Sequence, residues 1–378
     1  MFDYETLRVI WWMLLGVLLI AFAVMDGFDL GIGMLLHYVA RNNEERRVVI
    51  NSIGPVWEGN QVWLILGAGA IFAAWPDLYA ISFSGFYFAM LLVLFALILR
   101  PVGFKYRSKL HNIYWRAMWD LGIFIAGLVP ALCFGIALGN VLQGVPFYLD
   151  DMLRDFYTGS FRELFNPFAI LCGLVSVVML IMHGGVFLAI KTAGNIQKRA
   201  IHAAKICALL TILLFAIAGY WIVFKIAGYI LTNDVSHIAA SNPMHKQVML
   251  QVGAWINNYK NYHALLIVPL SAFIGALAVL LLTSLRCYRL AWIFSAIAIS
   301  SIIMTVGVSM FPFMLPSITH PEMSLLVWDS SSSQATLTIM LIASAVFIPL
   351  IVLYTGWVYY VLRGKVTQDE INKNTNAY

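Results

Sequence analysis

DGFDLGIG, residues 26–33, places two aspartates inside the first long apolar run of the chain. An ionisable side chain at membrane depth costs roughly 2.5–3.5 kcal/mol on insertion scales and by default marks a functional site. Asp26 and Asp29 are three residues apart, so a helix places both on one face. Gly27 and Gly31 fall on nearly the opposite face, where small residues favour close helix packing. This stretch therefore predicts a membrane helix that is contacted on both sides and whose acids face protein or water.

The composition indicates a polytopic membrane protein. Of the 378 residues, 62% are hydrophobic and 11% are charged, whereas a soluble domain carries about 25% charged residues. Apolar stretches that match the roughly 30 Å hydrocarbon layer recur along the whole chain. The second of them opens with a polar segment, NSIGPVWEGNQ. We predict nine spans, at about residues 9–36, 51–74, 78–99, 118–142, 165–190, 203–230, 263–283, 290–311 and 336–361.

The basic residues give the expected orientation. With nine spans, one side of the membrane receives all but six of the 23 Lys and Arg residues, the six being Arg8, Arg154, Arg162, Lys225, Lys246 and Lys260. Because positive residues stay cytoplasmic, we expect a single transmembrane domain over residues 1–378 with a periplasmic N-terminus and a cytoplasmic C-terminus. The same loops explain the net charge of +5, so no nucleic-acid partner is needed.

Cysteine and histidine offer little for metal or haem binding. Cys133, Cys172, Cys207 and Cys287 lie singly, without a C-x-x-C pair, and are expected to be packing residues. Of eight histidines, only His183 falls within a span, whereas haem held across a bundle needs axial ligands at buried positions. We therefore expect His183 to be a hydrogen-bonded core or helix-end residue. No metal or cofactor ligands are predicted in this chain.

The ionisable residues of the first four spans indicate a proton path. Glu58 opens the second apolar run in WEGNQVW, and Gln61 follows it one turn later with Asn60 nearby. Carboxylates linked by amides and water are typical of proton relays in membranes. Such a chain would lead from the cytoplasm toward a buried reaction centre. Five groups are expected at similar depth in the cytoplasmic half: Asp26, Asp29, Glu58, Arg100 and Asp120.

Two other interpretations of these groups stay open. Arg100 can simply neutralise one acid and hold helices together, or the acids can bind a coupling ion. Asp26 has the further alternative of an exposed or capping residue, which leaves Asp29 and Glu58 as the stronger pair.

Several motifs resemble subunit II of the cytochrome bd quinol oxidases. The N-terminal FDYETLRVIWW is followed by DGFDLGIG, WEGNQVWLI, FAAWP, FSGFY and RPVGFKYRSK. LGNVLQGVPF, FPFMLPS and WDSSSSQATL continue the resemblance to the end of the ninth span. The resemblance covers nearly the whole chain, and no single motif carries it.

The resemblance implies an all-α subunit of a heterodimeric quinol oxidase in the bacterial inner membrane, which reduces O2 to water and builds a proton gradient. About nine transmembrane helices would form two four-helix bundles plus a peripheral helix. A similarly folded subunit I would bind two haems b and haem d and oxidise the quinol, while this chain stabilises it without ligating haem. Contact with membrane lipid is expected. A small accessory subunit and a structural quinone between these helices stay open, as does the choice between ubiquinol and menaquinol.

The resemblance also bears on single residues. It places the acids at positions 29 and 58 near the subunit interface, with Arg100 close to them. Position 58 is often Asp in relatives, and Glu58 keeps the carboxylate on a longer side chain. His183 departs from relatives that have Gln or another residue there. Trp63 lies on the span that the resemblance connects with an apolar route for oxygen; the other interpretation is a packing aromatic.

Two other classes of function would also account for acids in the spans. An ion-coupled secondary transporter places acids among helix glycines, but it typically has paired broken helices in two repeats. NSIGPVWEGN is one such break, and no clear counterpart is found in the second half. A purely structural subunit differs from the oxidase interpretation only in whether the acids conduct protons.

Overall fold

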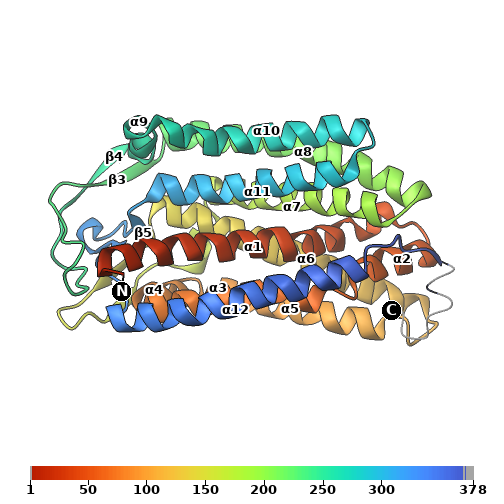
Figure 1. The fold of residues 1–378 in the computed structure, drawn as a ribbon, viewed down its shortest axis with the longest axis horizontal. Helices are drawn as coiled ribbons and strands as arrows, with labels where there is room; N and C mark the ends of the chain where they lie inside the picture. Colours follow the sequence, from red (N-terminus) through yellow and green to blue (C-terminus); the bar gives the residue numbers. More distant parts are fainter. Residues whose placement is uncertain (1, 369–370, 372–378) are drawn as a thin grey trace.

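Long helices that lie side by side along the longest axis of the molecule form most of this chain (Figure 1). The computed structural model describes residues 2–368 and 371. The N-terminus lies at one end of the helices and the last described residues lie at the other end. Length and composition alone make eight of the described helices suited to crossing a membrane.

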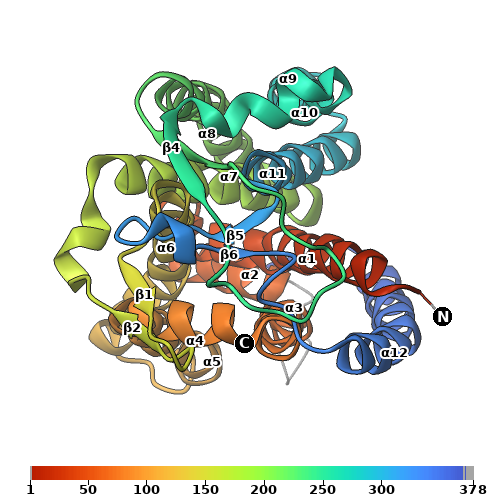
Figure 2. The same ribbon diagram turned by 90° about the vertical axis from the view of Figure 1, so that its left-hand side faces the viewer.

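Two groups of four helices pack against each other, and one helix lies outside them. The first group contains α1 (Tyr4–Val39), α3 (Trp57–Ala74), α5 (Tyr87–Tyr106) and α6 (Ile113–Gln143). The second contains α7 (Pro167–Lys191), α8 (Gly194–Phe224), α10 (Ile267–Ser284) and α11 (Tyr288–Met310). The last helix, α12 (Gln334–Val361), lies at the periphery beside α1 and α3, as Figure 2 shows. The predicted architecture of two four-helix bundles plus a peripheral helix is confirmed.

The two ends of the bundles differ. The end with the N-terminus, which we call the hairpin end, carries three short antiparallel strand pairs. These strands are β1 (Phe147–Leu149), β2 (Asp155–Tyr157), β3 (Ala227–Leu231), β4 (Val248–Val252), β5 (Phe313–Leu315) and β6 (Leu325–Leu326). Short helices lie among them: α4 (Pro76–Gly85), α9 (Asn257–Asn261), η1 (Phe161–Phe165), η2 (Ala254–Ile256), η3 (His263–Leu266) and η4 (Pro321–Met323). The other end, which we call the basic end, carries α2 (Asn43–Ile53) and the loop after α5, which contains Arg107 and Lys109.

Side-chain caps mark where several helices begin. The Asp3 carboxylate accepts a hydrogen bond from the backbone N–H of Thr6 at 3.1 Å and caps α1. Asn112 caps α6, and Ser333 caps α12. These residues accept from backbone N–H groups that have no partner within the first helical turn. The caps therefore set the ends of long apolar helices in a region where the sequence changes from polar to apolar.

Three predicted spans have different limits in the structure. The second, expected over 51–74, is divided, because α2 ends at Ile53 and α3 begins at Trp57. The polar first turn of α3 leaves it outside the eight most apolar helices, although it runs beside them. The third, expected over 78–99, is also divided at Phe86, and α5 continues to Tyr106. The sixth does not reach residue 230, because residues 227–231 pair with β4 as β3.

The glycines of DGFDLGIG bring the two bundles together, as their spacing predicts. A Cβ added at Gly31 would lie 2.0 Å from the carbonyl oxygen of Leu180 on α7. Gly184 on α7 is equally confined, since its added Cβ would lie 2.8 Å from the backbone nitrogen of Ile32. This close backbone approach fixes one face of α1 against α7. The opposite face of α1, with the two aspartates, therefore points toward the other helices of its own bundle.

Candidate functional site

Asp26 of α1 and Arg100 of α5 form a buried ion pair. Arg100 Nη1 donates to Asp26 Oδ1 at 2.7 Å and Nη2 donates to Oδ2 at 3.2 Å, a bidentate arrangement that fits the planar guanidinium. Asp26 is 0% exposed and Arg100 is 2% exposed. The Trp57 ring also faces the guanidinium, 5.4 Å from Cζ. The alternative of an exposed or capping Asp26 is therefore wrong. Arg100 lies inside α5, beyond the predicted end of the third span at residue 99.

Asp29 lies one turn further along α1, is also buried, and has different partners. Its Oδ2 accepts a hydrogen bond from Nδ2 of Asn60 on α3 at 2.7 Å. The Oδ1 of Asn60 accepts in turn from the hydroxyl of Tyr359 on α12 at 2.8 Å. Asp29 Oδ1 is buried and has no hydrogen-bond partner among the described residues. We call Asp26, Asp29, Asn60 and Arg100 the acidic cluster.

Glu58, the other strong candidate beside Asp29, does not join the acidic cluster. Its side chain is 66% exposed, and its Oε1 lies 3.8 Å from Nζ of Lys105, which is 59% exposed. The reason is helical geometry. Residues two positions apart point about 200° apart around a helix, so α3 turns Asn60 toward α1 and Glu58 away from it. Gln61, one turn after Glu58, is half-buried on α3.

Asp120 of α6 belongs to a second cluster nearer the basic end. Its Oδ1 accepts from Nε of Arg107 at 2.5 Å, and its Oδ2 accepts from Nη1 of Arg46 at 2.6 Å. Arg107 follows Arg100 by seven residues, which is about 10 Å along a helix. The predicted single group of five ionisable residues is therefore divided over two depths. Arg100 inside α5 pairs with Asp26, and Arg107, the residue directly after α5, pairs with Asp120.

Two other predicted residues have core environments. Trp63 is 5% exposed and packs in the main hydrophobic core of the molecule, which favours its interpretation as a packing aromatic. His183 is fully buried, and both ring nitrogens have partners: Nδ1 lies 2.6 Å from Ser295 Oγ and Nε2 lies 2.9 Å from the carbonyl oxygen of Val24. All eight histidines lie within the described residues, and only His183 is buried. The histidines of this chain therefore do not fit an axial haem site inside the bundles.

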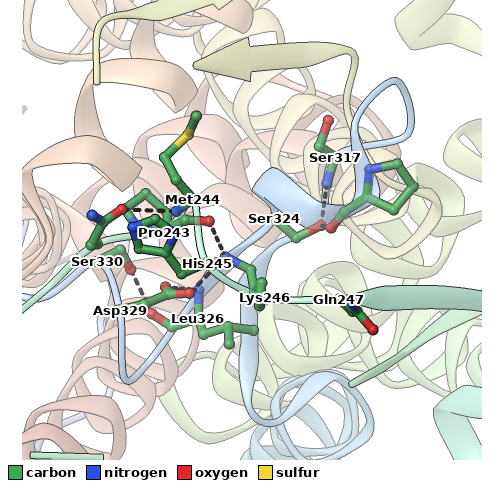
Figure 3. Close-up of polar contacts among 12 residues, drawn as sticks. Pro243, Met244, His245, Lys246, Gln247, Ser317, Ser324, Leu326, Asp329 and Ser330 are labelled. Atoms are coloured by element: carbon green, nitrogen blue, oxygen red, sulfur yellow. Dashed lines mark hydrogen bonds and ion pairs between the residues drawn. The ribbon is translucent and has the colours of Figure 1, made fainter. Parts of the chain in front are cut away.

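A further buried ion pair lies at the hairpin end, where no pattern in the sequence indicates one. Lys246 Nζ donates to Asp329 Oδ2 at 2.6 Å and to the carbonyl oxygen of Pro243 at 2.7 Å. Asp329 Oδ1 accepts from the backbone N–H of Leu326 at 2.8 Å. Figure 3 shows Lys246 pointing between these groups, which come from two separate loops. We call Lys246 and Asp329 the hairpin-end pair.

Burial acts against both charges of the hairpin-end pair. It lowers the pKa of Lys246 even though Asp329 opposes this change. It raises the pKa of Asp329 even though Lys246 and the Leu326 N–H oppose this change. Both directions mean that loss of contact with water outweighs the attraction between the partners. The pair therefore joins the two loops at a cost in desolvation.

Arg8, near the start of α1, connects the same two loops to this helix through hydrogen bonds. Its guanidinium donates to the carbonyl oxygen of His237 at 2.6 Å and to Ser331 Oγ at 2.7 Å. The side chain is fully buried, and its Cζ lies 3.6 Å from the ring centroid of Tyr4. Residues of the WDSSSSQ motif thus contact both the 232–247 loop and the beginning of α1. These contacts give the WDSSSSQ motif a structural role.

Comparisons with known proteins identify the family of this chain. A helical membrane protein with a charged cluster buried between its spans is a class that includes many transporters and respiratory enzymes. Residues 7–362 match the family model of cytochrome bd terminal oxidase subunit II. The chain belongs to this family, whose members are subunits of a quinol oxidase. The family name implies haem in the complex and a partner subunit, and the eight apolar helices fit a multi-pass membrane protein.

Individual relatives agree over the full length. The chain is 49% identical over 377 residues to cytochrome bd-I ubiquinol oxidase subunit 2 of Escherichia coli K12, covering 100% of both chains. It is 30% identical to cytochrome bd ubiquinol oxidase subunit 2 of Bacillus subtilis, covering 97% of this chain and 98% of that protein. A bd oxidase chain from Geobacillus thermodenitrificans has the same fold, with a TM-score of 0.70 at 17% identity, over 95% of this chain and 98% of that one.

Proposed function

We propose that this chain is the subunit of a bacterial inner-membrane quinol oxidase that binds no haem and supports the haem-bearing subunit I. Both nitrogens of the buried His183 already have hydrogen-bond partners, which supports haem ligation by the partner. The complex would reduce O2 to water with quinol as donor and build a proton gradient. The ubiquinol named for the Escherichia coli relative is the proposed quinol class. Family membership disfavours the transporter alternative.

The proposal extends to a proton path through Asp29. The observation that carries it is the buried Asp29 Oδ1 without a partner among the described residues, beside an Asp26 carboxylate that Arg100 already holds with two hydrogen bonds. One guanidinium neutralises one carboxylate, and a second buried negative charge would be costly. Asp29 is therefore the carboxyl of the cluster that can take up and release a proton. Asp26 acts as the fixed counter-ion of Arg100.

Glu58 has a different place in this proposal. An ionisable side chain that points away from its own bundle at the edge of the membrane is costly unless protein or water covers it. Glu58 and Lys105 are both more than half exposed in this single chain. We place the contact with subunit I on this face. Glu58 would then exchange protons between the cytoplasmic side and the interface, separately from the buried Asp29.

The orientation of the chain is part of the proposal and has its own test. The hairpin end would be periplasmic and the basic end cytoplasmic. Met152 is 77% exposed at the hairpin end, and Lys109 is exposed at the basic end. In a Cys287→Ser background, an impermeant thiol reagent added to intact cells should label Met152→Cys and leave Lys109→Cys unlabelled. The reverse pattern would overturn the orientation.

Asp29→Asn tests the proton path in the assembled complex. The amide keeps the shape of the carboxyl but cannot carry the transferred proton. Oxygen consumption per haem d should fall, by about a hundredfold if the loss matches the lower range of proton-transfer contributions. Haem d content should stay near the wild-type value. Asp26→Asn is the matched control, because it leaves Arg100 unpaired and should lower the yield of complex instead. If Asp29→Asn keeps the wild-type oxygen consumption per haem d, the acids only hold helices together.

A further inference from the structure

Tyr359 connects the peripheral helix to the acidic cluster. The last helix, α12, has few buried residues, but the Tyr359 hydroxyl reaches Asn60 Oδ1 at 2.8 Å. The Tyr359 ring also packs edge-on against Phe28, the neighbour of Asp29, with centroids 6.4 Å apart. The two contacts hold this tyrosine beside the functional segment of α1. The hydrogen bond joins residues that are 299 positions apart in the sequence.

The Tyr359 hydroxyl donates to Asn60 and so favours one orientation of the Asn60 amide. A tyrosine hydroxyl that donates to Asn60 needs an acceptor, and only Oδ1 of the amide is one. Nδ2 is then turned to Asp29 and donates to its Oδ2 at 2.7 Å. Without the tyrosine hydroxyl, a protonated Asp29 could donate to Oδ1 of a flipped amide instead. Tyr359, as the donor in this arrangement, thus supports the amide orientation in which Asp29 Oδ2 accepts.

This orientation leaves one oxygen of Asp29 for the proton. Oδ2 faces an N–H donor, so a proton on Oδ2 would meet another proton donor. Oδ1 is buried and has no partner within the described chain, so it is the oxygen that can accept the proton. We propose that Tyr359 and Asn60 are positioning residues that reserve Asp29 Oδ1 for proton uptake and release. This inference rests on the proposed proton path through Asp29.

The test uses the intact oxidase complex and a spectroscopic signature of Asp29. Redox-induced infrared difference spectra record the carbonyl stretch of a protonated carboxyl, and the band that is lost in Asp29→Asn belongs to Asp29. Tyr359→Phe removes the hydroxyl but keeps the ring against Phe28. We expect this variant to shift or split the Asp29 band and to lower turnover per haem d severalfold. The control Tyr354→Phe changes an exposed tyrosine of the same helix, which is 63% exposed, and should change neither.

Each outcome decides between the two proposals. An unchanged band and unchanged turnover in Tyr359→Phe would overturn the positioning role. A collapse of haem d content would also overturn it, because the hydroxyl would then serve assembly. If Asp29→Asn leaves turnover unchanged, the proton path itself fails. In that case the infrared band of Tyr359→Phe still decides whether the hydroxyl orients the carboxyl.

Discussion

The acidic cluster and the hairpin-end pair have nearly the same ion-pair distance but different surroundings. Arg100 Nη1 lies 2.7 Å from Asp26 Oδ1, and Lys246 Nζ lies 2.6 Å from Asp329 Oδ2. At the hairpin end, both oxygens of Asp329 accept hydrogen bonds. In the acidic cluster, Asp29 Oδ1 and Arg100 Nε are buried without partners among the described residues. Charge burial alone therefore does not distinguish the two sites, but their hydrogen-bond satisfaction does.

This difference in hydrogen-bond satisfaction indicates different roles for the acidic cluster and the hairpin-end pair. A buried polar group without a partner costs free energy, and a structure that serves only stability has no reason to keep it. The hairpin-end pair joins two loops, and both oxygens of its carboxylate are used. The acidic cluster joins three helices and still leaves one carboxyl oxygen open. A fully satisfied pair fits a structural role, whereas the open oxygen of Asp29 fits a group whose protonation changes.

Arg100→Met should have the largest effect on assembly of any single substitution in the two sites. It leaves Asp26 and Asp29 buried with no guanidinium between them, deep among α1, α3 and α5. Removing one partner of a buried pair costs about 3–5 kcal/mol. Because two carboxyls lose the same cation, the expected cost for this variant is at the upper end of that range. The expected result is a large loss of assembled, haem-d-containing complex in membranes, measured by difference spectra.

Arg100→Lys and Arg107→Met sharpen this comparison. Lysine keeps the charge but cannot make two parallel hydrogen bonds, so Arg100→Lys should recover part of the yield. Arg107→Met removes a partner of Asp120 but leaves Arg46 in contact with it at 2.6 Å, so its loss of complex should be smaller. Equal yields for Arg100→Met and the wild type would show that the acidic cluster needs no cation.

The helices of this protein were largely predictable from its sequence because apolar length decides them. The stretch DGFDLGIG also predicted two contacted faces of α1, and the structure confirms that Gly31 meets α7. The division after Ile53 lies in NSIGPVWEGN, which the sequence indicated as a break although the predicted span ran through it. The division at Phe86 was missed, since apolar content continues across residues 78–99 and hides the end of α4. β3 was missed for a related reason, as AGYIL is apolar enough to extend a predicted span.

The site was predictable in its members but not in its pairing. Asp29, Asp26 and Arg100 were found because charge at membrane depth is conspicuous in the sequence. Which acid meets which partner depends on helix rotation, and this rotation turns Asn60 inward and Glu58 outward. Tyr359 and the hairpin-end pair carried no local signal. Tyr359 binds Asn60, 299 positions away, and Lys246 binds Asp329, 83 positions away. A tyrosine near a helix end and a single lysine in a loop are common in any sequence, so neither indicates such a partner.

Lys246→Met should have a smaller effect than Arg100→Met and should depend on pH. It leaves Asp329 buried with one hydrogen-bond donor, the Leu326 N–H, and with the more distant charge of Arg8. The expected loss at neutral pH is about 3 kcal/mol, the lower end for a broken buried pair. The measurement is the thermal loss of haem d absorbance in the purified complex, compared with the wild type at each pH.

The pH dependence follows from the direction of the Asp329 pKa. Burial raises this pKa, and Lys246 opposes the rise, so the variant should raise the folded-state pKa further. A carboxyl whose folded pKa is raised contributes stability that is fully present below the unfolded pKa and is lost as pH rises through the folded pKa. The deficit of Lys246→Met should therefore narrow as pH falls. The double variant Lys246→Met/Asp329→Leu removes both charges of the hairpin-end pair and should recover most of the stability at neutral pH. A double variant as unstable as Lys246→Met, or a deficit that grows in acid, would show that the pair does more than join two loops.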